Sequence, residues 1–208
     1  AASSRRYRAC VIGATEQGDY GHQLHRLWAL RDDIDVVGLA DLHEQGREHY
    51  GKEAKAQRVY ADYREMLAKE KPDLVAVAPR WTIHHKDYLL ACAEAGAHGI
   101  VEKPLAPDLA EADAIIDAMR AKNLKWAVAF NFRASPVVRH ARKHIVEGGF
   151  IGRVLELRGR GKEDNRSGGE DLIVLGVHVF DLMRYFSGPA QWCEAEVLVE
   201  GRAATPAD

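Results

Sequence analysis

Short apolar runs alternate with helical patterns along the first 130 residues of the chain. The runs lie at residues 9–12, 34–40, 58–60, 73–78, 99–101 and 125–130. Apolar residues at helical spacing, or helix-start signals, predict helices between them, over 23–30, 42–50, 85–95 and 108–122 and from Asp62 onward. Apolar runs without alternation are typical of parallel strands that helices cover on both faces. The pattern therefore predicts an α/β domain built on a doubly wound parallel sheet.

The pattern changes after Phe130. It predicts a helix, a half-exposed strand, a polar glycine-rich loop, a strongly apolar helix and a further strand, at residues 135–147, 153–160, 161–170, 171–186 and 192–199. One or two strands cannot bury the face of a sheet by themselves. We therefore expect two domains, the first over 1–130 and the second begun at 131–208, with the remainder of the second missing from this sequence.

Composition narrows the class of protein. The 208 residues include 29 Lys and Arg against 31 Asp and Glu, a net charge of −2, and 47% hydrophobic residues. These values exclude disordered, collagen-like and coiled-coil chains, and near-neutral charge gives no field that would attract nucleic acid or an anionic membrane. No apolar run is long enough to cross a bilayer. The three cysteines have no Cys-x-x-Cys spacing, so neither a disulfide framework nor a zinc site is expected.

The first residues, Ala-Ala-Ser-Ser-Arg-Arg, contain no apolar stretch of the signal-peptide type. Together with the cysteine pattern, this favours a reducing, cytoplasmic compartment. A mature chain would keep no record of an export signal that had been removed, so that alternative stays open.

Glycines after the first apolar run carry the first chemical signal. Gly13 and Gly18 bracket Thr15 as the outer glycines of a Gly-x-Gly-x-x-Gly dinucleotide turn would, between strand and helix. The first glycine permits the tight turn, and the third permits close packing of helix on strand. Thr15 replaces the middle glycine; its Cβ would crowd a phosphate unless the loop, lengthened toward Gly21, moves away, although its hydroxyl could also donate to the phosphate. The alternative is a plain strand-to-helix turn.

Asp41 ends the second apolar run, 23 residues after Gly18. A carboxylate at this place can accept hydrogen bonds from both ribose hydroxyls of an adenosine, and it would repel a 2′-phosphate. This predicts that NAD is preferred over NADP. The alternative is that Asp41 only caps the following helix.

Glu102, Lys103 and Pro104 follow the fifth apolar run. They are expected at the carboxyl edge of the sheet, where ligands of open α/β folds bind. Pro104 disfavours the helical region for Lys103 and directs it to an extended or turn geometry, from which the lysine could face the crevice. The alternative is a surface lysine at a strand end.

Taken together, these motifs resemble the Gfo/Idh/MocA oxidoreductases, a family named for glucose-fructose oxidoreductase and inositol dehydrogenase. The resemblance covers nearly the whole chain and rests on residues 13–18, 41, 85–98, 102–104, 131–133 and 168–181. It implies an N-terminal Rossmann domain followed by an α/β domain whose open, mostly antiparallel sheet covers the active site. That second domain commonly mediates oligomerisation, so a homodimer or homotetramer is expected.

The resemblance also implies roles for individual residues. It places the cofactor at Gly13, Thr15, Gly18, Asp41, Arg80, Trp81, His85, Glu102 and Lys103, and a small-molecule substrate at Lys103, Arg133, Arg160 and His178. Arg80 and Trp81 stand where the family has Thr-Pro, which would put a guanidinium and an indole beside the nicotinamide. Lys103 would contact the substrate hydroxyl, and His178 would accept its proton.

The pairing of Lys103 with His178 has a physical basis. Hydride leaves a carbinol carbon only if the hydroxyl proton is also taken, which suits an imidazole, while an ammonium stabilises the developing alkoxide. The alternative for His178 is a structural histidine, whose ring nitrogens find hydrogen-bond partners inside an apolar helix. Many members of the family carry an aspartate one turn before this histidine, where this chain has Val174. Asp171 or Glu170 could substitute as the catalytic carboxylate, the base could work alone, or the chemistry could differ.

Two histidine pairs have spacings that could seat a metal, His22 with His25 and His140 with His144. Neither has a third ligand within sequence reach, so no metal is expected and all four are assigned to the surface. A basic cluster surrounds the glycine-rich loop, at Arg158, Arg160, Lys162 and Arg166. It could be solvated, or it could bind an acidic or polyhydroxylated substrate.

Two classes of function remain. The first is an NAD-dependent oxidoreductase acting on a secondary alcohol of a sugar, polyol or sugar derivative. A variant of it keeps NAD bound and uses it transiently, to epimerise a carbon or cleave a glycosidic bond. The second is a non-catalytic sensor of a nucleotide or sugar. Thr15 and Val174 favour the sensor, whereas Lys103 and His178 favour the enzyme more strongly; the sequence does not tell which substrate reacts.

Overall fold

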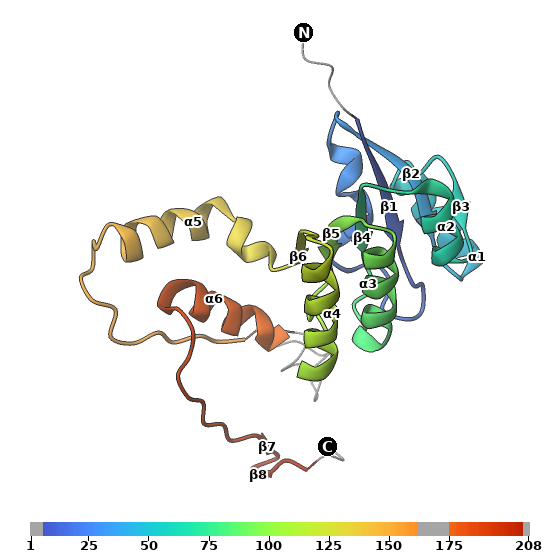
Figure 1. Cartoon of the computed structure of the whole chain (residues 1–208). Coiled ribbons are helices and arrows are strands. Elements are labelled where there is room, and N and C mark those ends of the chain that lie inside the picture. The colour runs from blue at the N-terminus through green and yellow to red at the C-terminus, as the bar shows by residue number, and fades with distance from the viewer. Residues whose placement is uncertain (1–5, 162–174, 206–208) are drawn as a thin grey trace. The chain divides into compact units, whose positions relative to one another are not determined.

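The computed structural model describes residues 6–161 and 175–205 of the chain. The chain divides into two compact units, residues 1–129 and 130–208, and each is described by itself. Figure 1 labels their helices and strands. Within the described ranges, no helix combines the length and the apolarity needed to cross a membrane.

A six-stranded parallel sheet forms the centre of the first unit. Its strands are β1 (Tyr7–Ile12), β2 (Ile34–Ala40), β3 (Val59–Tyr60), β4 (Leu74–Val77), β5 (His98–Val101) and β6 (Trp126–Val128). They lie in the order β3-β2-β1-β4-β5-β6, and all neighbours are parallel. This is the order of the doubly wound nucleotide-binding sheet, so the predicted fold is confirmed. Such sheets bind ligands beyond the carboxyl ends of β1 and β4, where the strand order reverses.

Three of the four α-helices described in the first unit begin at a side-chain cap. The four are α1 (Glu44–Glu53), α2 (Tyr63–Glu70), α3 (His85–Glu94) and α4 (Leu109–Ala121), and α3 begins without such a cap. The Asp62 carboxylate accepts a hydrogen bond from the Arg64 nitrogen at 2.7 Å. The Asp108 carboxylate does the same for the Glu111 nitrogen at 2.8 Å. Each cap satisfies a backbone donor that the first turn of a helix leaves unpaired, and all four helices confirm predicted ones.

The segment after the glycine turn does not form the helix predicted over 23–30. It forms two short 3-10 helices, η1 (Gly21–Arg26) and η2 (Trp28–Leu30). His22 and Gln23 have φ values of +44° and +56°, in the left-handed region that a right-handed α-helix excludes. Of the apolar residues in this segment, Leu24 is 6% exposed, whereas Leu30 is 80% exposed. A hydrogen bond from the Gly21 nitrogen to the Ala78 carbonyl at 2.8 Å holds the start of η1 beside the end of β4.

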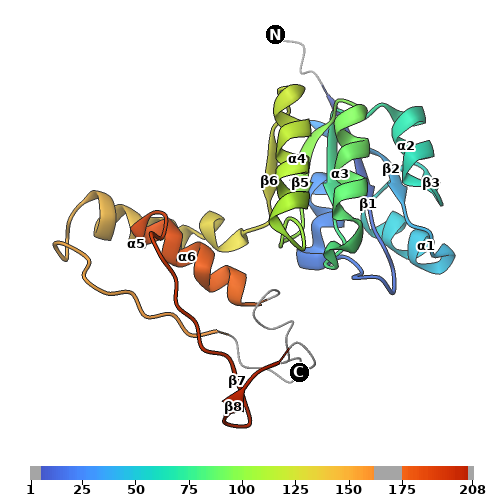
Figure 2. The same cartoon turned by 60° about the horizontal axis from the view of Figure 1, so that its bottom comes forward.

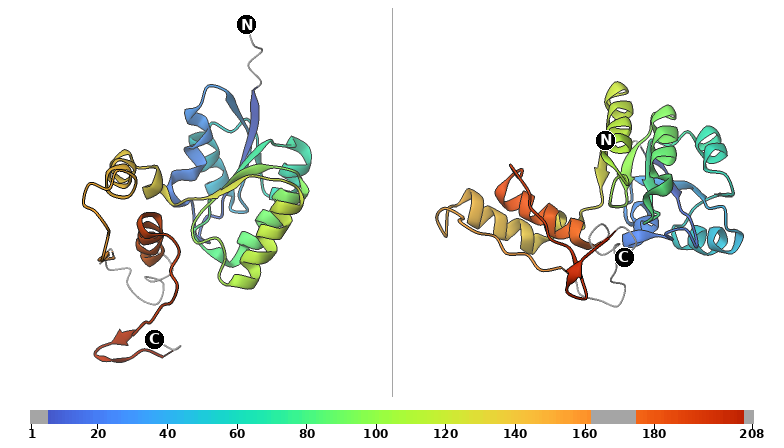
Figure 3. Two further views of the ribbon diagram at one scale, coloured as in Figure 1. Left: turned by 60° about the vertical axis from the view of Figure 1, so that its left-hand side comes forward. Right: turned by 90° about the horizontal axis from the view of Figure 1, so that it is seen from below.

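Two hydrophobic cores lie on the two faces of the sheet, because successive residues of β1 point in opposite directions. Cys10 and Ile12 are buried in one core, with Leu89 of α3. Val11 is buried in the other, with Leu24 of η1. Figure 2 shows α2, α3 and α4 side by side along one face. The left panel of Figure 3 shows the blue segment of η1 and η2 on the opposite side of the sheet from the green α3 and α4.

In the second unit, the described residues of 130–205 form helices and little sheet. Its elements are η4 (Asn131–Ala134), α5 (Pro136–Arg142), η5 (Lys143–Glu147), α6 (Val177–Ser187), β7 (Leu198–Val199) and β8 (Arg202–Ala203). The helix predicted over 135–147 is confirmed as α5 continued by η5, with Pro136 in its first turn. The apolar helix predicted over 171–186 is described from residue 175 onward, and residues 171–174 lie outside the described residues.

The strands predicted in the second unit are largely wrong. Residues 153–160 form no strand, and of residues 192–199 only β7 does. Alternation expresses a preference for strand, but a strand forms only where a partner strand supplies hydrogen bonds. β7 pairs with β8 across a two-residue turn. In that turn Glu200 and Gly201 have φ of +50° and +79°, as primed hairpin turns require.

The Glu70 carboxylate ties the end of α2 to two strands and is 3% exposed. It accepts hydrogen bonds from Nε of Arg58 at 2.5 Å, from Nη2 of Arg58 at 2.6 Å and from Nη2 of Arg8 at 2.9 Å. The Tyr60 hydroxyl donates a further one. The hydrogen bonds from Arg58 are the main cause that lowers the pKa of the Glu70 carboxyl, to about 2.

Glu70→Gln is expected to lower the free energy of unfolding at pH 7 by about 2 to 3 kcal/mol, because two half-exposed arginines lose a buried counter-charge. Since the folded pKa lies below the unfolded value of 4.5, the wild-type advantage is complete above that pH and disappears as pH falls through about 2. Urea denaturation at pH 7 and in acid measures both effects. Glu65→Gln, which breaks an exposed pair with Lys69 on the same helix, should cost less than about 0.5 kcal/mol. Equal losses in the two variants would contradict this role of Glu70.

Candidate functional site

A cavity of about 760 Å³ lies at the carboxyl edge of the sheet in the first unit. Its walls are the glycine turn, the ends of β1 and β2, the segment that starts α2 and the beginning of α3, at residues 12–17, 40–43, 61–63, 84, 87 and 88. Sites for small molecules commonly enclose about 300 to 1,000 Å³. The fold thus brings the predicted glycine turn and Asp41 together on one cavity.

Gly13 and Gly18 both lie where a side chain has no room. A Cβ at Gly13 would clash with the ring of Tyr20, and one at Gly18 would lie 2.5 Å from the backbone nitrogen of Trp81. Gly18 also has φ of +99°, which residues with a Cβ rarely adopt. The turn therefore needs glycine at both positions. At Gly13, the Tyr20 ring occupies the space that a Cβ would need.

Asp41 holds this turn from the end of β2 and is 2% exposed. Its Oδ2 accepts hydrogen bonds from the Thr15 nitrogen at 3.1 Å, from the Thr15 hydroxyl at 2.7 Å and from the Tyr20 hydroxyl at 2.8 Å. A hydroxyl has one proton to donate. The Thr15 hydroxyl donates it to Asp41, so the suggested use of that hydroxyl on a phosphate is not what the structure shows.

The other oxygen of Asp41, Oδ1, accepts a hydrogen bond from the His43 nitrogen at 2.9 Å. Oδ1 therefore accepts fewer hydrogen bonds than Oδ2 and has capacity for a further donor. The residue that caps α1 is His43, whose Nδ1 accepts from the Gly46 nitrogen at 3.1 Å. The alternative that Asp41 caps this helix is therefore wrong.

Tyr20 is a site residue that sequence reasoning missed. Its ring stacks on Tyr50 of α1, with centroids 3.8 Å apart. Burial, and then the neighbouring Asp41 carboxylate, raise the pKa of the Tyr20 hydroxyl far above its ordinary value. The hydroxyl therefore stays protonated and remains a donor to Asp41. The sequence holds no motif that marks this tyrosine.

Arg80 and Trp81 follow β4, and their side chains have different roles. Arg80 donates from Nε to the Gly18 carbonyl at 2.9 Å and from its backbone nitrogen to the same oxygen at 3.1 Å. Its Nη2 lies 3.3 Å from Oδ2 of Asp19. Arg80 thus clamps the glycine turn, whereas the Trp81 indole is 50% exposed and presents a flat surface.

His85 is fully buried and joins two loops of the carboxyl edge. Its Nδ1 lies 3.1 Å from the Leu105 carbonyl and its Nε2 lies 2.8 Å from the Pro79 carbonyl. Both ring nitrogens face backbone oxygens of the chain itself. His85 thus braces the loops after β4 and β5; direct contact with a cofactor stays a prediction that this placement does not support.

Glu102 and Lys103 are buried at the end of β5, with exposed fractions of 0% and 3%. Oε2 of Glu102 accepts a hydrogen bond from the Lys103 nitrogen at 2.7 Å. Oε1 of Glu102 contacts Nδ1 of His22. The alternative of a surface lysine is therefore wrong, and the peptide between Lys103 and Pro104 is cis.

The assignment to the surface is wrong for His25, whereas His22 is exposed as predicted. His25 is 3% exposed, and its Nε2 lies 2.8 Å from Oε2 of Glu53. Burial lowers the pKa of His25, against the opposing effect of Glu53. His22 reaches Glu102, which is 80 positions away. No periodicity or motif in the sequence connects residues so far apart.

In the second unit, Arg133 forms an ion pair with Asp181 of α6. Its Nε lies 2.8 Å from Oδ2, and its Nη2 lies 2.6 Å from Oδ1. Asp181 raises the pKa of the Arg133 guanidinium, and its side chain is only 8% exposed. Arg133, which the resemblance assigned to the substrate, joins η4 to α6 here.

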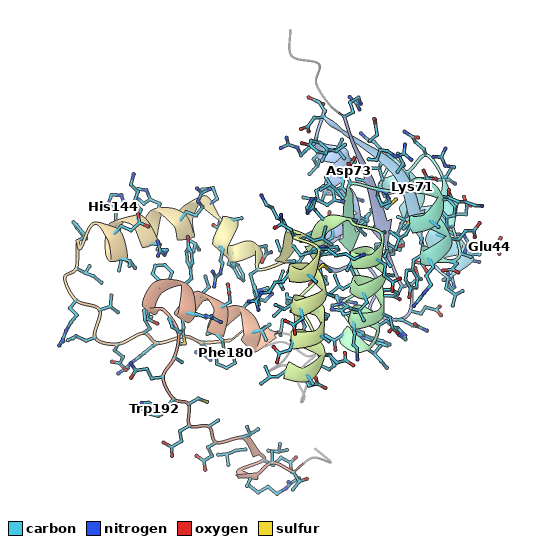
Figure 4. All side chains as sticks on the ribbon, viewed as in Figure 1. Glu44, Lys71, Asp73, His144, Phe180 and Trp192 are labelled. Carbon is cyan, nitrogen blue, oxygen red and sulfur yellow. The ribbon has the colours of Figure 1, made fainter. Side chains whose placement is uncertain are left out.

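His178 lies in the first turn of α6 and is partly buried. Its ring is edge-on to Phe132, with centroids 5.2 Å apart, and to Phe130 at 6.2 Å. Farther along α6, Phe180 is 56% exposed; its side chain is labelled in Figure 4. Arg160 is exposed in the segment that precedes the undescribed residues.

Several predicted residues lie outside the described residues, at Lys162, Arg166, Glu170, Asp171 and Val174. Their roles stay predictions. Lys103 belongs to the first unit and His178 to the second, so their pairing also stays a prediction. In the parts of the chain that the structure describes, no three His, Cys, Asp or Glu side chains gather as metal ligands.

The strand order, the glycine turn and the acid at the end of β2 define a Rossmann domain of the dinucleotide-binding class. Residues 7–130 match the family model GFO_IDH_MocA, described as an oxidoreductase family with an NAD-binding Rossmann fold. The chain belongs to this family, which confirms the resemblance found in the sequence.

Curated relatives include several dehydrogenases. The levoglucosan dehydrogenase of Pseudarthrobacter phenanthrenivorans is 36% identical over 144 residues, which cover 62% of this chain and 36% of that protein. The D-apiose dehydrogenase of Paraburkholderia graminis is 29% identical, over 88% of this chain and 50% of that protein. The D-glucoside 3-dehydrogenase of Escherichia coli is 27% identical, over 90% and 56%. The chain thus spans about half the length of these relatives, or less.

Solved structures show the same fold. The scyllo-inositol dehydrogenase of Lactobacillus casei, crystallised with NAD(H) and scyllo-inositol, has a TM-score of 0.76 at 18% identity, over 88% of this chain and 56% of that one. The myo-inositol 2-dehydrogenase of Lactobacillus plantarum has a TM-score of 0.73 at 24% identity, over 88% and 57%. At these identities the likeness extends to the fold alone.

Proposed function

We propose that this protein is an NAD-dependent oxidoreductase that transfers hydride between the nicotinamide and a secondary alcohol of a sugar, polyol or sugar derivative. The observation that carries the proposal is Lys103, a lysine 3% exposed at the carboxyl edge of a dinucleotide-binding sheet. Burying a lysine is costly, and this lysine lies at the edge where doubly wound sheets bind their ligands. The relatives are named as dehydrogenases of levoglucosan, D-apiose and D-glucosides, which supports a carbohydrate alcohol as the substrate.

The residues of the cavity fit the adenosine half of NAD. Its volume of about 760 Å³ suits a ligand of this size, and the glycine turn supplies backbone to one wall. Oδ1 of Asp41 can accept a hydrogen bond from a ribose hydroxyl, while Oδ2 is filled by Thr15 and Tyr20. The exposed indole of Trp81 offers an apolar surface to the nicotinamide half. When bound, NAD supplies the hydride acceptor.

The chain's own residues handle the oxygen and its proton. The Lys103 ammonium donates a hydrogen bond to the substrate oxygen and stabilises the negative charge that develops as the C–H bond breaks. The His178 imidazole accepts the hydroxyl proton. The alcohol thus loses one hydride and one proton and becomes a carbonyl. The proposal requires Lys103 and His178 to meet on one substrate.

An assay of the full-length protein tests this function. NADH formation is measured spectroscopically with levoglucosan, D-apiose, D-glucosides and inositols as candidate alcohols. Turnover of at least one of them is expected. Tight binding of NAD without turnover of any alcohol, or of the corresponding ketone with NADH, would contradict the proposal.

NAD is expected to bind at least tenfold more tightly than NADP. A 2′-phosphate would lose one charge-assisted hydrogen bond to Asp41 and be repelled by it, worth about 1.5 to 3 kcal/mol. Fluorescence titration with both nucleotides measures the ratio. Asp41→Asn should reduce the ratio several-fold, whereas Asp62→Asn, at another acid of the cavity wall, should leave it unchanged. Equal affinities for the two nucleotides would refute the assignment of Asp41.

One observation favours a second candidate, the non-catalytic sensor. Thr15 stands at the middle position of the glycine motif and is bonded to Asp41 through both its nitrogen and its hydroxyl. This leaves fewer groups of the turn for a phosphate. A mass spectrum of the denatured protein as purified separates the candidates further. Stoichiometric NAD supports the variant that recycles its cofactor, while its absence leaves the ordinary dehydrogenase or the sensor, which the turnover assay then distinguishes.

A further inference from the structure

A histidine of the glycine loop reaches the residue before Lys103. His22 lies in η1 with φ of +44° and ψ of +22°, and Gln23 follows with φ of +56°. Two successive left-handed residues that are not glycine are unusual, because the Cβ crowds the following carbonyl. This backbone brings Nδ1 of His22 onto Oε1 of Glu102. Strained backbone of this kind persists where surrounding contacts over-determine it, and it gathers at functional sites.

The Glu102 carboxylate is enclosed on both sides. It is 0% exposed, and its Oε2 accepts a hydrogen bond from the Lys103 nitrogen at 2.7 Å. On the other side, a Cβ at Gly21 would lie 2.5 Å from its Cδ. A buried carboxylate requires hydrogen-bond donors, and these two contacts place one on each oxygen. The carboxylate is therefore clamped between the glycine loop and the backbone of Lys103.

The two segments that clamp Glu102, the start of η1 and the residues after β5, are both hydrogen-bonded to the end of β4. The Gly21 nitrogen donates to the Ala78 carbonyl at 2.8 Å, and the Glu102 nitrogen donates to the Val77 carbonyl at 2.9 Å. The start of η1 and the residues after β5 are thus hydrogen-bonded to adjacent carbonyls at the end of β4.

We propose that His22 is a positioning residue for Lys103. It holds Glu102, and Glu102 fixes the backbone N–H of Lys103 and with it the direction in which the lysine side chain leaves the sheet edge. Because η1 follows the glycine turn directly, the contact also joins the placement of Lys103 to the loop that lines the nucleotide cavity. The role in catalysis rests on the proposed function, whereas the positioning itself does not.

Two substitutions of His22 separate the effect of its N–H donor from the effect of its left-handed backbone conformation. His22→Asn keeps an N–H close to the place of Nδ1, and asparagine tolerates left-handed φ. His22→Gly suits the backbone better still but has no donor. Gln23→Gly is the matched control, since it relaxes the neighbouring left-handed residue without touching Glu102.

In the enzyme, His22→Gly is expected to lower kcat at least tenfold while the Kd of NAD and the KM of the alcohol stay within threefold. His22→Asn is expected to recover most of the lost kcat, and Gln23→Gly to behave like the wild type. A parallel loss in His22→Asn would overturn the proposal, because it shows that a donor at this place does not restore Lys103. An equal loss in Gln23→Gly would also overturn it, because it assigns the effect to the backbone.

A readout without turnover tests the positioning itself. An N-hydroxysuccinimide ester labels lysines, and mass spectrometry follows the rate at Lys103, with exposed Lys122 as the internal reference. His22→Gly should raise the relative rate at Lys103 at least threefold, and His22→Asn should restore it. An unchanged rate in His22→Gly overturns the proposal even in an active enzyme. A raised rate in a protein that turns over no alcohol supports the positioning and refutes only the proposed function.

Discussion

Lys103→Met is expected to lower kcat by roughly a hundredfold or more while the affinity for NAD stays within a few-fold. Methionine keeps most of the apolar stem that packs in this 3% exposed position, so the fold is spared, but it removes the ammonium. The developing alkoxide then loses its one proposed cation, and a group of this kind commonly contributes two to three orders of magnitude. Single-turnover kinetics with NAD and the best alcohol measure the chemical step directly.

Lys122→Met provides the control for this experiment. Lys122 is exposed, and its Nζ donates only to the Glu94 carbonyl at 3.2 Å. Its loss should leave kcat and nucleotide affinity unchanged. If Lys103→Met kept full turnover, the lysine would serve the fold alone, and the proposed function would lose the observation that carries it.

His178→Asn is expected to lower kcat/KM by about a hundredfold at neutral pH, because general-base catalysis by a positioned imidazole contributes on the order of 10²–10⁴-fold. The wild-type pH profile of kcat/KM should have a rising limb, since only the neutral imidazole can accept a proton. That limb should disappear in the variant. Affinity for NAD should not change, because His178 contacts no part of the adenosine half in this proposal.

His144→Asn is the matched control, in the same unit and on η5, where His144 lies beside His140 with ring centroids 4.2 Å apart. It should retain both the rate and the rising limb (His144 is labelled in Figure 4). Full turnover by His178→Asn would show that the base lies elsewhere. The first alternatives are then Asp171 and Glu170, which precede α6 in the sequence.

The succession of elements in the first unit could be predicted because each depends on residues close together in the chain. The run at residues 34–40 is apolar at almost every position and became β2 over the same span. Asp62 and Asp108 marked the starts of α2 and α4 because a cap acts on backbone two or three residues away. The second unit resisted this approach, since residues 153–160 have the alternation of a strand but no partner strand among the described residues.

The site could be predicted in its motifs but not in its contacts. Gly18, Asp41 and Lys103 were found because a tight turn, an acid at a strand end and a lysine before proline each leave a local mark. The residues that these side chains contact leave no such mark in the sequence. Tyr20 donates a hydrogen bond to Asp41, which is 21 positions away in the sequence, and His22 contacts Glu102, which is 80 positions away.

By itself, the sequence determined the six strands and the four α-helices of the first unit, the places where glycine is required and the residues that carry ionisable chemistry. Only the tertiary structure decided which group each polar side chain engages. The order of the sheet sets β1 between β2 and β4, and this brings the glycine turn against Asp41 on one side and against the residues after β4 on the other. The same packing turned the predicted helix at 23–30 into 3-10 turns, because the hydrogen bond of Gly21 and the contact of His22 with the buried Glu102 outweigh the weak preference of a short segment for the α-helix.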